Sequence, residues 1–115
     1  MDWDGNCLFC KIVANEIPAA IVKKTESFTA FKDITPQAPT HILIIPNQHY
    51  ENMAAVADAD SQLAGEIFRA AGEIAAEIGL DSYRMNINTG AEAGQSVFHA
   101  HLHLLGGRSF AWPPG

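Results

Sequence analysis

The clearest periodicity in the chain lies between Asp60 and Ile78. Apolar residues recur there every three or four positions, and charged residues occupy the positions between them. This pattern predicts an amphipathic helix that covers a sheet. Asp58 or Asp60 can cap its start, and Gly79 suits the left-handed residue that follows many helices. The predicted buried positions are Leu63, Ile67, Ala71, Ile74 and Ile78.

Short apolar runs before this helix predict strands. Ile21–Lys24 and Ser27–Asp33 form a pair of candidate strands separated by two residues. The segment 33–40 carries two prolines and is expected to be a loop. It leads into His41–Ile45, whose β-branched residues favour a strand that Pro46 ends.

Two more strands are predicted after the long helix, and a short helix is predicted near the N-terminus. Apolar and polar residues alternate in Ser82–Asn88, and Val97–Leu105 ends at a glycine pair. A helix over Cys7–Asn15 is expected, with Asn6 as its N-cap. Its inward-facing residues are expected to be Leu8, Ile12 and Val13. Together these elements predict an α+β fold, with a mainly antiparallel sheet of about five strands, one long helix and one short helix.

Length and composition predict one globular domain over residues 1–115, because domains commonly contain about 100–150 residues. A hydrophobic content of 48% excludes a disordered chain, and a net charge of −6 argues against binding to nucleic-acid polymers. The polar, acidic start of the chain and the lack of a membrane-length apolar run predict a cytoplasmic protein. The apolar tail 110–115 is expected to pack on this subunit or on another.

Three of the five histidines, His99, His101 and His103, alternate along the last predicted strand. On a strand they would face one side, with neighbours about 6.6–7 Å apart, while Phe98, Ala100, Leu102 and Leu104 would face the core. The outer two histidines would start about 13 Å apart and so could not bind one metal together. A row of imidazoles suits nucleophilic or acid–base chemistry at neutral pH.

The turn before these histidines, Ala93–Val97, has the composition of a phosphate-binding loop. Gly94 allows the backbone to approach an anion, successive amide groups can surround its oxygens, and Ser96 adds a hydroxyl. A phosphate-binding site is therefore expected beside the histidines.

The segment 94–105, Gly-Gln-Ser-Val-Phe-His-Ala-His-Leu-His-Leu-Leu, resembles the histidine-triad (HIT) motif. Segments 31–41 and 83–88, and the ending Gly106-Gly-Arg108 with Trp112-Pro-Pro-Gly115, resemble the Hint branch of that family. The resemblance implies a HIT-like fold and a homodimer. It also implies a purine nucleoside phosphoramidase that hydrolyses AMP joined to an amine, and aminoacyl adenylates, without a catalytic metal.

Residue roles follow from this resemblance alone. It implies that His101 is the nucleophile, that His103 contacts the phosphate beside Asn88, and that Ser96 hydrogen-bonds the leaving nitrogen or the phosphate. His41 would be a proton partner behind them. Asp33 would hold the ribose hydroxyls, and a histidine at position 103 favours hydrolysis over transfer. The full set of implied nucleotide-binding residues is Phe9, Ile12, Phe31, Asp33, Ile34, Asn88, Gln95, Ser96, Val97, His101 and His103.

Cys7 and Cys10 have the spacing of half a zinc site, although two free thiols are an equally good interpretation of so short a motif. The resemblance adds two further ligands, because some bacterial HIT proteins complete a structural zinc site with histidines that correspond to His49 and His99. A structural zinc is therefore expected on these four residues.

Three other functions remain open. A dinucleoside polyphosphate hydrolase would share the triad, but the ending Trp112–Gly115 favours the phosphoramidase branch. A regulatory protein that only binds purine nucleotides would have no need of His101 and Ser96. A metalloenzyme is disfavoured by the spacing of the outer histidines.

Overall fold

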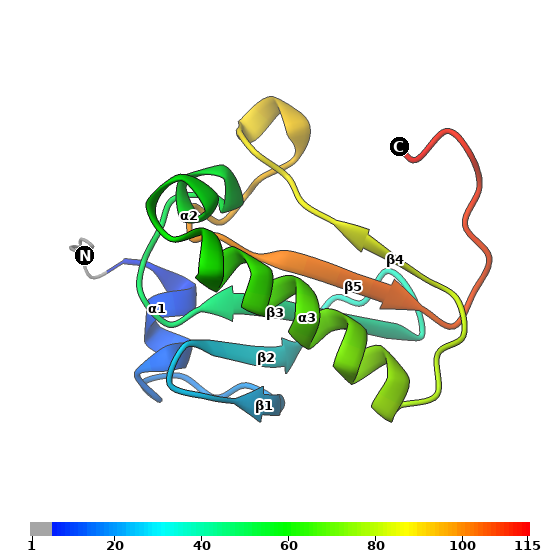
Figure 1. Ribbon diagram of the computed structural model, residues 1–115, viewed down its shortest axis with the longest axis horizontal. Coiled ribbons are helices and arrows are strands. Elements are labelled where there is room, and N and C mark those ends of the chain that lie inside the picture. The colour runs from blue at the N-terminus through cyan, green and yellow to red at the C-terminus, as the bar shows by residue number, and fades with distance from the viewer. Residues whose placement is uncertain (1–5) are drawn as a thin grey trace.

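The computed structural model describes residues 6–115 and contains one five-stranded antiparallel sheet (Figure 1). The strand order is β1-β2-β3-β5-β4, so β3 and β5 lie side by side in the middle of the sheet. The α+β class and the antiparallel sheet are confirmed. In chain order the elements are α1 (Leu8–Val13), β1 (Ile21–Lys24), β2 (Phe28–Lys32), β3 (Thr40–Pro46), α2 (Met53–Ala59), α3 (Ser61–Glu77), β4 (Tyr83–Asn86), the 3₁₀ turn η1 (Ala91–Ala93) and β5 (Leu102–Gly106).

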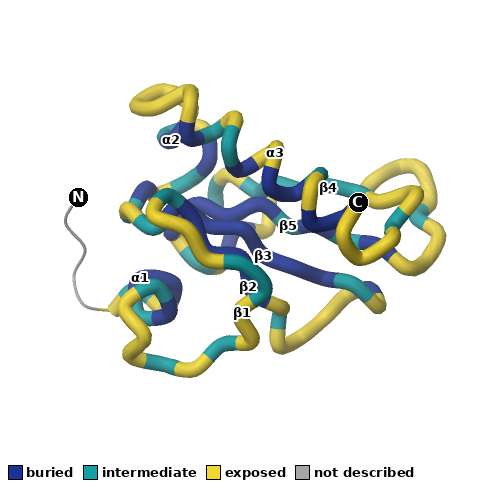
Figure 2. The backbone as a smooth tube through the Cα atoms, turned by 60° about the horizontal axis from the view of Figure 1, so that its bottom comes forward, coloured by how far each residue is buried: buried dark blue, intermediate teal, exposed yellow. Residues whose placement is uncertain are grey.

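One face of the sheet is covered by α2 and α3, and the main core lies between these layers (Figure 1, Figure 2). Alternation along β3 sends Ile42 and Ile44 to this face, together with Leu102 and Leu104 of β5. The long helix is confirmed: Asp60 caps it by accepting a hydrogen bond from the Leu63 amide at 3.1 Å. The glycine that follows it, Gly79, has a φ of 81° as expected. The prediction for Ile78 is wrong, because this residue caps the helix and its side chain is 47% exposed.

The opposite face of the sheet is covered at one end by α1. Leu43 and Ile45 of β3 point to this side and pack with Phe9 and Ile12 of the helix and Phe31 of β2. His103 pairs with Leu43 across the β3–β5 ladder, and His41 stands two residues away on the same face. The polar residues of this face therefore lie beside a small apolar cluster, outside the main core.

Three details of the helices differ from the sequence predictions. Cys7, not Asn6, is the N-cap of α1, and its Sγ accepts from the Cys10 amide at 3.2 Å. Leu8 does not face inward, because its side chain is 47% exposed. The helix α2 was not predicted, since only Met53 and Val56 of its seven residues are buried and so short a helix shows no clear periodicity.

The last strand begins later than its alternating pattern predicts. β5 starts at Leu102, so His99 and His101 lie on an irregular segment before it. Phe98 was expected in the core and is 45% exposed instead. In this segment the Ala100 amide donates to the carbonyl of Tyr50 at 2.7 Å and does not take part in the β3–β5 ladder. As a consequence the three histidines do not form a straight row.

The C-terminal tail contacts its own subunit at Phe110, while residues 111–115 are exposed. Arg84 and Arg108 place their guanidinium groups 5.0 and 4.2 Å from the centre of its ring, and Arg84 also donates to the carbonyl of Ala111. Trp112 remains 83% exposed. Among residues 6–115, no helix is both long and apolar enough to cross a membrane.

Candidate active site

Hydrogen bonding determines which nitrogen of His101 carries the proton. Its Nδ1 lies 2.7 Å from the carbonyl oxygen of His99, and a carbonyl can only accept, so Nδ1 is protonated. Nε2 therefore carries the free lone pair. Burial lowers the pKa of His101, partly opposed by this hydrogen bond, so the ring is neutral at pH 7. His101 is 7% exposed and meets Phe9 edge-on, with ring centres 5.2 Å apart. The arrangement presents a neutral imidazole with one available lone pair.

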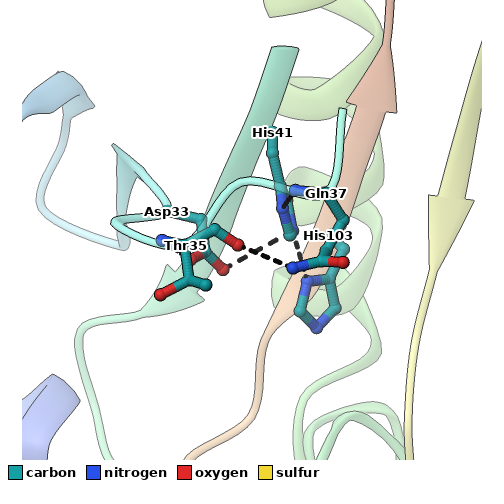
Figure 3. A network of polar contacts seen from close by, with 5 residues as sticks. All are labelled: Asp33, Thr35, Gln37, His41 and His103. Atoms are coloured by element: carbon teal, nitrogen blue, oxygen red, sulfur yellow. Dashed lines mark hydrogen bonds and ion pairs between the residues drawn. The ribbon is translucent and has the colours of Figure 1, made fainter. Parts of the chain in front are cut away.

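Hydrogen bonds also determine which nitrogens of His41 and His103 carry the proton (Figure 3). The Gln37 amide donates to Nδ1 of His41 at 3.0 Å, so the proton of His41 is on Nε2. This Nε2–H points to Nδ1 of His103 at 2.9 Å, which must then accept. His103 consequently carries its own proton on Nε2. Within residues 6–115 that Nε2 is buried without a hydrogen-bond partner, which leaves an unpaired N–H donor.

Burial also keeps the pair formed by His41 and His103 neutral. It lowers the pKa of His103 to about 4, with His101 and His41 adding repulsion, and it lowers the pKa of His41 against the attraction of Asp33. The Asp33 carboxylate lies 3.6 Å from Nε2 of His41. The rings of His101 and His103 are 4.9 Å apart, so the lone pair and the free N–H donor belong to one site.

Ligand atoms of Asp33, His41 and His103 also lie within 4.8 Å of one another, as in some metal sites. The amide of Gln37 argues against this use. It occupies the lone pair on Nδ1 of His41, so a metal on Nε2 would require an imidazolate. These three residues are therefore better described as a hydrogen-bonded chain that orients His103.

The loop predicted to bind phosphate lies against Asn88, and its Ser96 shares a cleft with Cys7 and His49 of the cysteine–histidine cluster. Gly94 has a φ of 100°, and a Cβ there would stand 3.8 Å from Nδ2 of Asn88, so the amide side chain lies against the turn. Ser96 is exposed and lines an open cleft of 550 Å³ with Cys7, Leu8, His49, Glu51, Val97 and others. The side chain of Gln95 is different, because it is buried and bonded to backbone groups.

An apolar pocket of 250 Å³ collects the residues expected to contact a base and a ribose. Phe9, Ile12, Phe31 and Ile34 line it together with Asp33 and Val97. Ile34 is 94% exposed and stands at its rim. Sequence reasoning missed six further lining residues. One of them is Lys32, and the other five have an apolar character that alone does not distinguish them from core positions: Leu8, Ile17, Pro18, Ala19 and Leu43.

The two cysteines meet His49 and His99 in a second cluster. Sγ of Cys7 is 3.3 Å from Nδ1 of His99, and Sγ of Cys10 is 3.3 Å from Nδ1 of His49. The two Nδ1 atoms are 3.2 Å apart. All four ligand atoms lie within 4.8 Å of one another, and the cysteines form no disulfide. The cluster joins α1, the end of β3 and the start of the histidine segment.

These donors fit a closed tetrahedral zinc site. Bonds of about 2.0–2.3 Å in a tetrahedron place ligand atoms about 3.3–3.8 Å apart, close to the separations found here. Nε2 of His99 is 2.8 Å from the carbonyl of Pro46 and must donate to it, so Nδ1 is left with the lone pair a metal needs. Burial lowers the pKa of His99 to about 4 and raises that of Cys10 to about 12, where the Cys7 thiol adds to the effect. Neutral imidazoles suit metal ligation. A bound cation would stabilise the thiolate form of both cysteines and so offset the effect of burial on their ionisation.

Two interactions that orient the site involve backbone groups that sequence reasoning did not find. The Gln37 amide and the His99 carbonyl decide where the protons of His41 and His101 lie. Backbone groups of this kind have no sequence signal, because every residue other than proline carries them. The only related feature of the sequence is the pair of prolines in the loop before His41, which restricts the backbone conformation there.

Comparison with known proteins identifies the class. The HIT domain family profile matches residues 14–110, and the chain belongs to this family. An uncharacterized HIT-like protein of Synechocystis is 50% identical over 109 residues, which cover 94% of this chain and 96% of the relative. A 14 kDa zinc-binding protein of Zea mays is 45% identical over 116 residues, covering 97% and 90%.

The solved structures agree with this assignment. A HIT family hydrolase from Legionella pneumophila superposes with a TM-score of 0.91 at 50% identity and covers 96% of this chain and 100% of its own. The HIT fold expected from the sequence is therefore confirmed, and the chain has the fold of a HIT family hydrolase.

Proposed function

We propose that this protein is a nucleotide hydrolase of the Hint type, which cleaves the P–N bond of purine nucleoside 5′-phosphoramidates. The observation that carries the proposal is that one of two adjacent imidazoles offers a nucleophilic lone pair and the other offers a hydrogen-bond donor. His101 offers a lone pair on Nε2, and His103 offers an unpaired N–H on its own Nε2. A phosphoryl group requires both a nucleophile and a donor for its oxygens.

In the first step Nε2 of His101 attacks phosphorus. A P–N bond to the histidine forms, and the P–N bond to the amine breaks. The amine leaves with the electrons of the broken bond and takes up a proton supplied by water, while Ser96 hydrogen-bonds the leaving nitrogen. The product is a nucleotidyl-histidine. In the second step water attacks phosphorus and releases a proton to solvent. The P–N bond to His101 breaks, AMP is released, and His101 regains its lone pair.

His103 and the backbone of the 94–97 turn would stabilise the charge on the non-bridging oxygens. Because His41 holds Nδ1 of His103 by donation, the proton of His103 stays on Nε2 throughout. The neutral state of these rings favours nucleophilic attack, since a protonated His101 would have no lone pair. The apolar pocket supports a base between Phe9, Ile12 and Phe31, with Asp33 near the ribose.

We propose that the Cys7, Cys10, His49 and His99 cluster holds one zinc ion. Four protein ligands would close the tetrahedron, so the ion would stabilise the fold and leave no position for substrate. We further propose that the chain forms a homodimer. The tail supports this assignment, because Trp112 is 83% exposed in the single subunit.

The proposal is tested by AMP release from adenosine 5′-phosphoramidate, with the His101→Ala variant and with a chelator present. The expected result is turnover by the wild type with and without chelator, a loss of at least about 10³-fold in the variant, and AMP binding that both proteins retain before chelator is added. Turnover that requires added metal would indicate a metalloenzyme. Faster cleavage of a diadenosine polyphosphate would favour the polyphosphate branch, and AMP binding without any turnover would favour a regulatory protein.

A further inference from the structure

Gln95 lies in the loop between β4 and β5 and is 3% exposed, although its neighbour Ser96 is exposed. A buried glutamine must satisfy both ends of its amide. Oε1 accepts from the Gly90 amide at 2.9 Å, and Nε2 donates to the carbonyls of Glu51 at 2.7 Å and Val97 at 3.1 Å. Three of the four hydrogen bonds that this side chain can form are thus made within the protein.

These bonds join three separate pieces of chain. Gly90 begins the turn that contains η1, Glu51 precedes α2, and Val97 begins the approach to the histidines. The backbone of Gln95 is also engaged, since its amide donates to the Gly90 carbonyl at 3.1 Å. The orientation of the amide is determined, because exchanging its oxygen and nitrogen would oppose all three side-chain bonds.

The backbone of segment 46–51 accepts hydrogen bonds from this loop and from the residues that follow it. Its carbonyls accept from His99 at Pro46, from the Ala100 amide at Tyr50, and from Gln95 at Glu51. The first two contacts order the residues after Val97. The bond from Gln95 orders the residues before it, which include Ser96. This part of the loop has no strand pairing to hold it.

We propose that Gln95 is a positioning residue that holds Ser96 in place and does not itself contact the nucleotide. The proposal rests on the proposed function, because Ser96 is the partner of the leaving amine. A direct contact with phosphate would require the amide to break at least one of its buried hydrogen bonds, and an unpaired buried group is costly.

The test compares Gln95→Met, which keeps the size of the side chain and removes its hydrogen bonds, with Ser96→Ala and with the double variant. Gln95→Met is expected to lower kcat by at least about tenfold while AMP affinity stays within about twofold. In the Ser96→Ala background its effect is expected to shrink to about twofold, because the residue it positions is already lost. Penalties that multiply, or a loss of AMP affinity equal to the loss of kcat/KM, would overturn the proposal.

Thr29→Val serves as the matched control. Thr29 is fully buried and donates to Oδ1 of Asn47 at 2.7 Å, so the variant also removes a buried side-chain hydrogen bond. Its thermal stability is expected to fall as that of Gln95→Met does, with kcat unchanged. An equal fall of kcat in the control would assign the effect of Gln95 to general stability and overturn the proposal. Gln95→Glu, which keeps the acceptor for Gly90 and loses both donors, is the second variant if Gln95→Met does not fold.

Amide hydrogen exchange gives a readout independent of turnover. Gln95→Met is expected to speed exchange in residues 94–98 and to leave α3 unchanged, and unchanged exchange in 94–98 would overturn the proposal. A wild-type protein that releases no AMP would refute the proposed function alone, since the exchange result still reports whether Gln95 holds the loop.

Discussion

The carbonyl oxygen of His99 accepts a hydrogen bond from Nδ1 of His101 at 2.7 Å, while the imidazole of His99 belongs to the cluster with Cys7 and Cys10. One residue therefore links the candidate metal site to the ring proposed as nucleophile. Phe9 strengthens this link, because it lies next to Cys10 in sequence on α1 and meets His101 edge-on. Disturbing the cluster is therefore expected to change the position of the His101 ring.

Removing the donor behind His103 is expected to slow the reaction. In His41→Phe the ring keeps its shape, but Nδ1 of His103 loses its partner and its proton is no longer directed to Nε2. We expect kcat to fall by about 10²-fold, with a smaller change in KM. Steady-state kinetics with adenosine 5′-phosphoramidate measure this.

His41→Gln is the control for that experiment, because its amide still offers an N–H donor. Its kcat is expected to lie between those of the wild type and His41→Phe. Equal rates in all three proteins would show that the hydrogen bond from His41 does not matter for turnover.

Zinc is expected to bind at about one ion per chain and to stabilise the fold. The purified protein should contain zinc by elemental analysis, and a strong chelator should lower its melting temperature, because closed Cys₂His₂ sites contribute directly to folding. Cys10→Ser should lose the metal. Its melting temperature should be lower and should no longer respond to chelator.

AMP binding provides a second readout of the same change. The helix α1 has six residues and is too short to be stable alone, and it carries Phe9 and Ile12 of the apolar pocket. We therefore expect weaker AMP binding after chelation. A chelator response that is the same in Cys10→Ser as in the wild type would contradict the assignment of the metal to this cluster.

Stability is expected to fall as the pH is lowered from 7 to 5. His103 titrates with a pKa of about 4 in the folded protein, against about 6.5 in an unfolded chain. Between these values the unfolded state binds a proton that the native state does not, so the free energy of unfolding rises with pH and is lost on acidification. The lowered pKa of His41 acts in the same direction.

Urea unfolding at several pH values checks this expectation, with His103→Gln as the comparison. Glutamine cannot titrate, so the stability of that variant should depend less steeply on pH over the same window, by at most the equivalent of one proton. Parallel curves for the two proteins would mean that His103 does not remain neutral in the folded state.

Two glycines are expected to respond in opposite ways to alanine. Gly107 has a φ of 90°, and a Cβ there would lie 2.9 Å from Cβ of Pro39, so Gly107→Ala should destabilise the protein by more than about 1 kcal/mol. Gly65 lies within α3 with no atom within 4 Å of an added Cβ. Gly65→Ala should stabilise by about 0.5–1 kcal/mol, because it improves helix propensity. Urea unfolding of both variants measures the difference, and equal effects would contradict this account.

The amino-acid sequence by itself determined the elements whose pattern is strong and local. The long helix follows from its periodicity and the buried strand after His41 from its β-branched composition, because each pattern extends over several residues. The sequence offered Asp58 or Asp60 as the cap of the helix, and the structure shows that Asp60 is the cap. The spacing of Cys7 and Cys10 was compatible with half of a metal site and equally with two free thiols. The short helix α2 was missed because its seven residues bury only two side chains.

Only the tertiary structure decided which histidines lie in the cysteine–histidine cluster and which lie in the candidate active site. Strand alternation would give His99, His101 and His103 one common face. In the structure the Ala100 amide bonds to the Tyr50 carbonyl outside the ladder, His99 lies with the cysteines, and the rings of His101 and His103 are adjacent. The proton positions on His41 and His101 likewise depend on backbone groups of Gln37 and His99. Such contacts join segments far apart in sequence, and a local pattern carries no information about which carbonyl or amide folding brings to a ring.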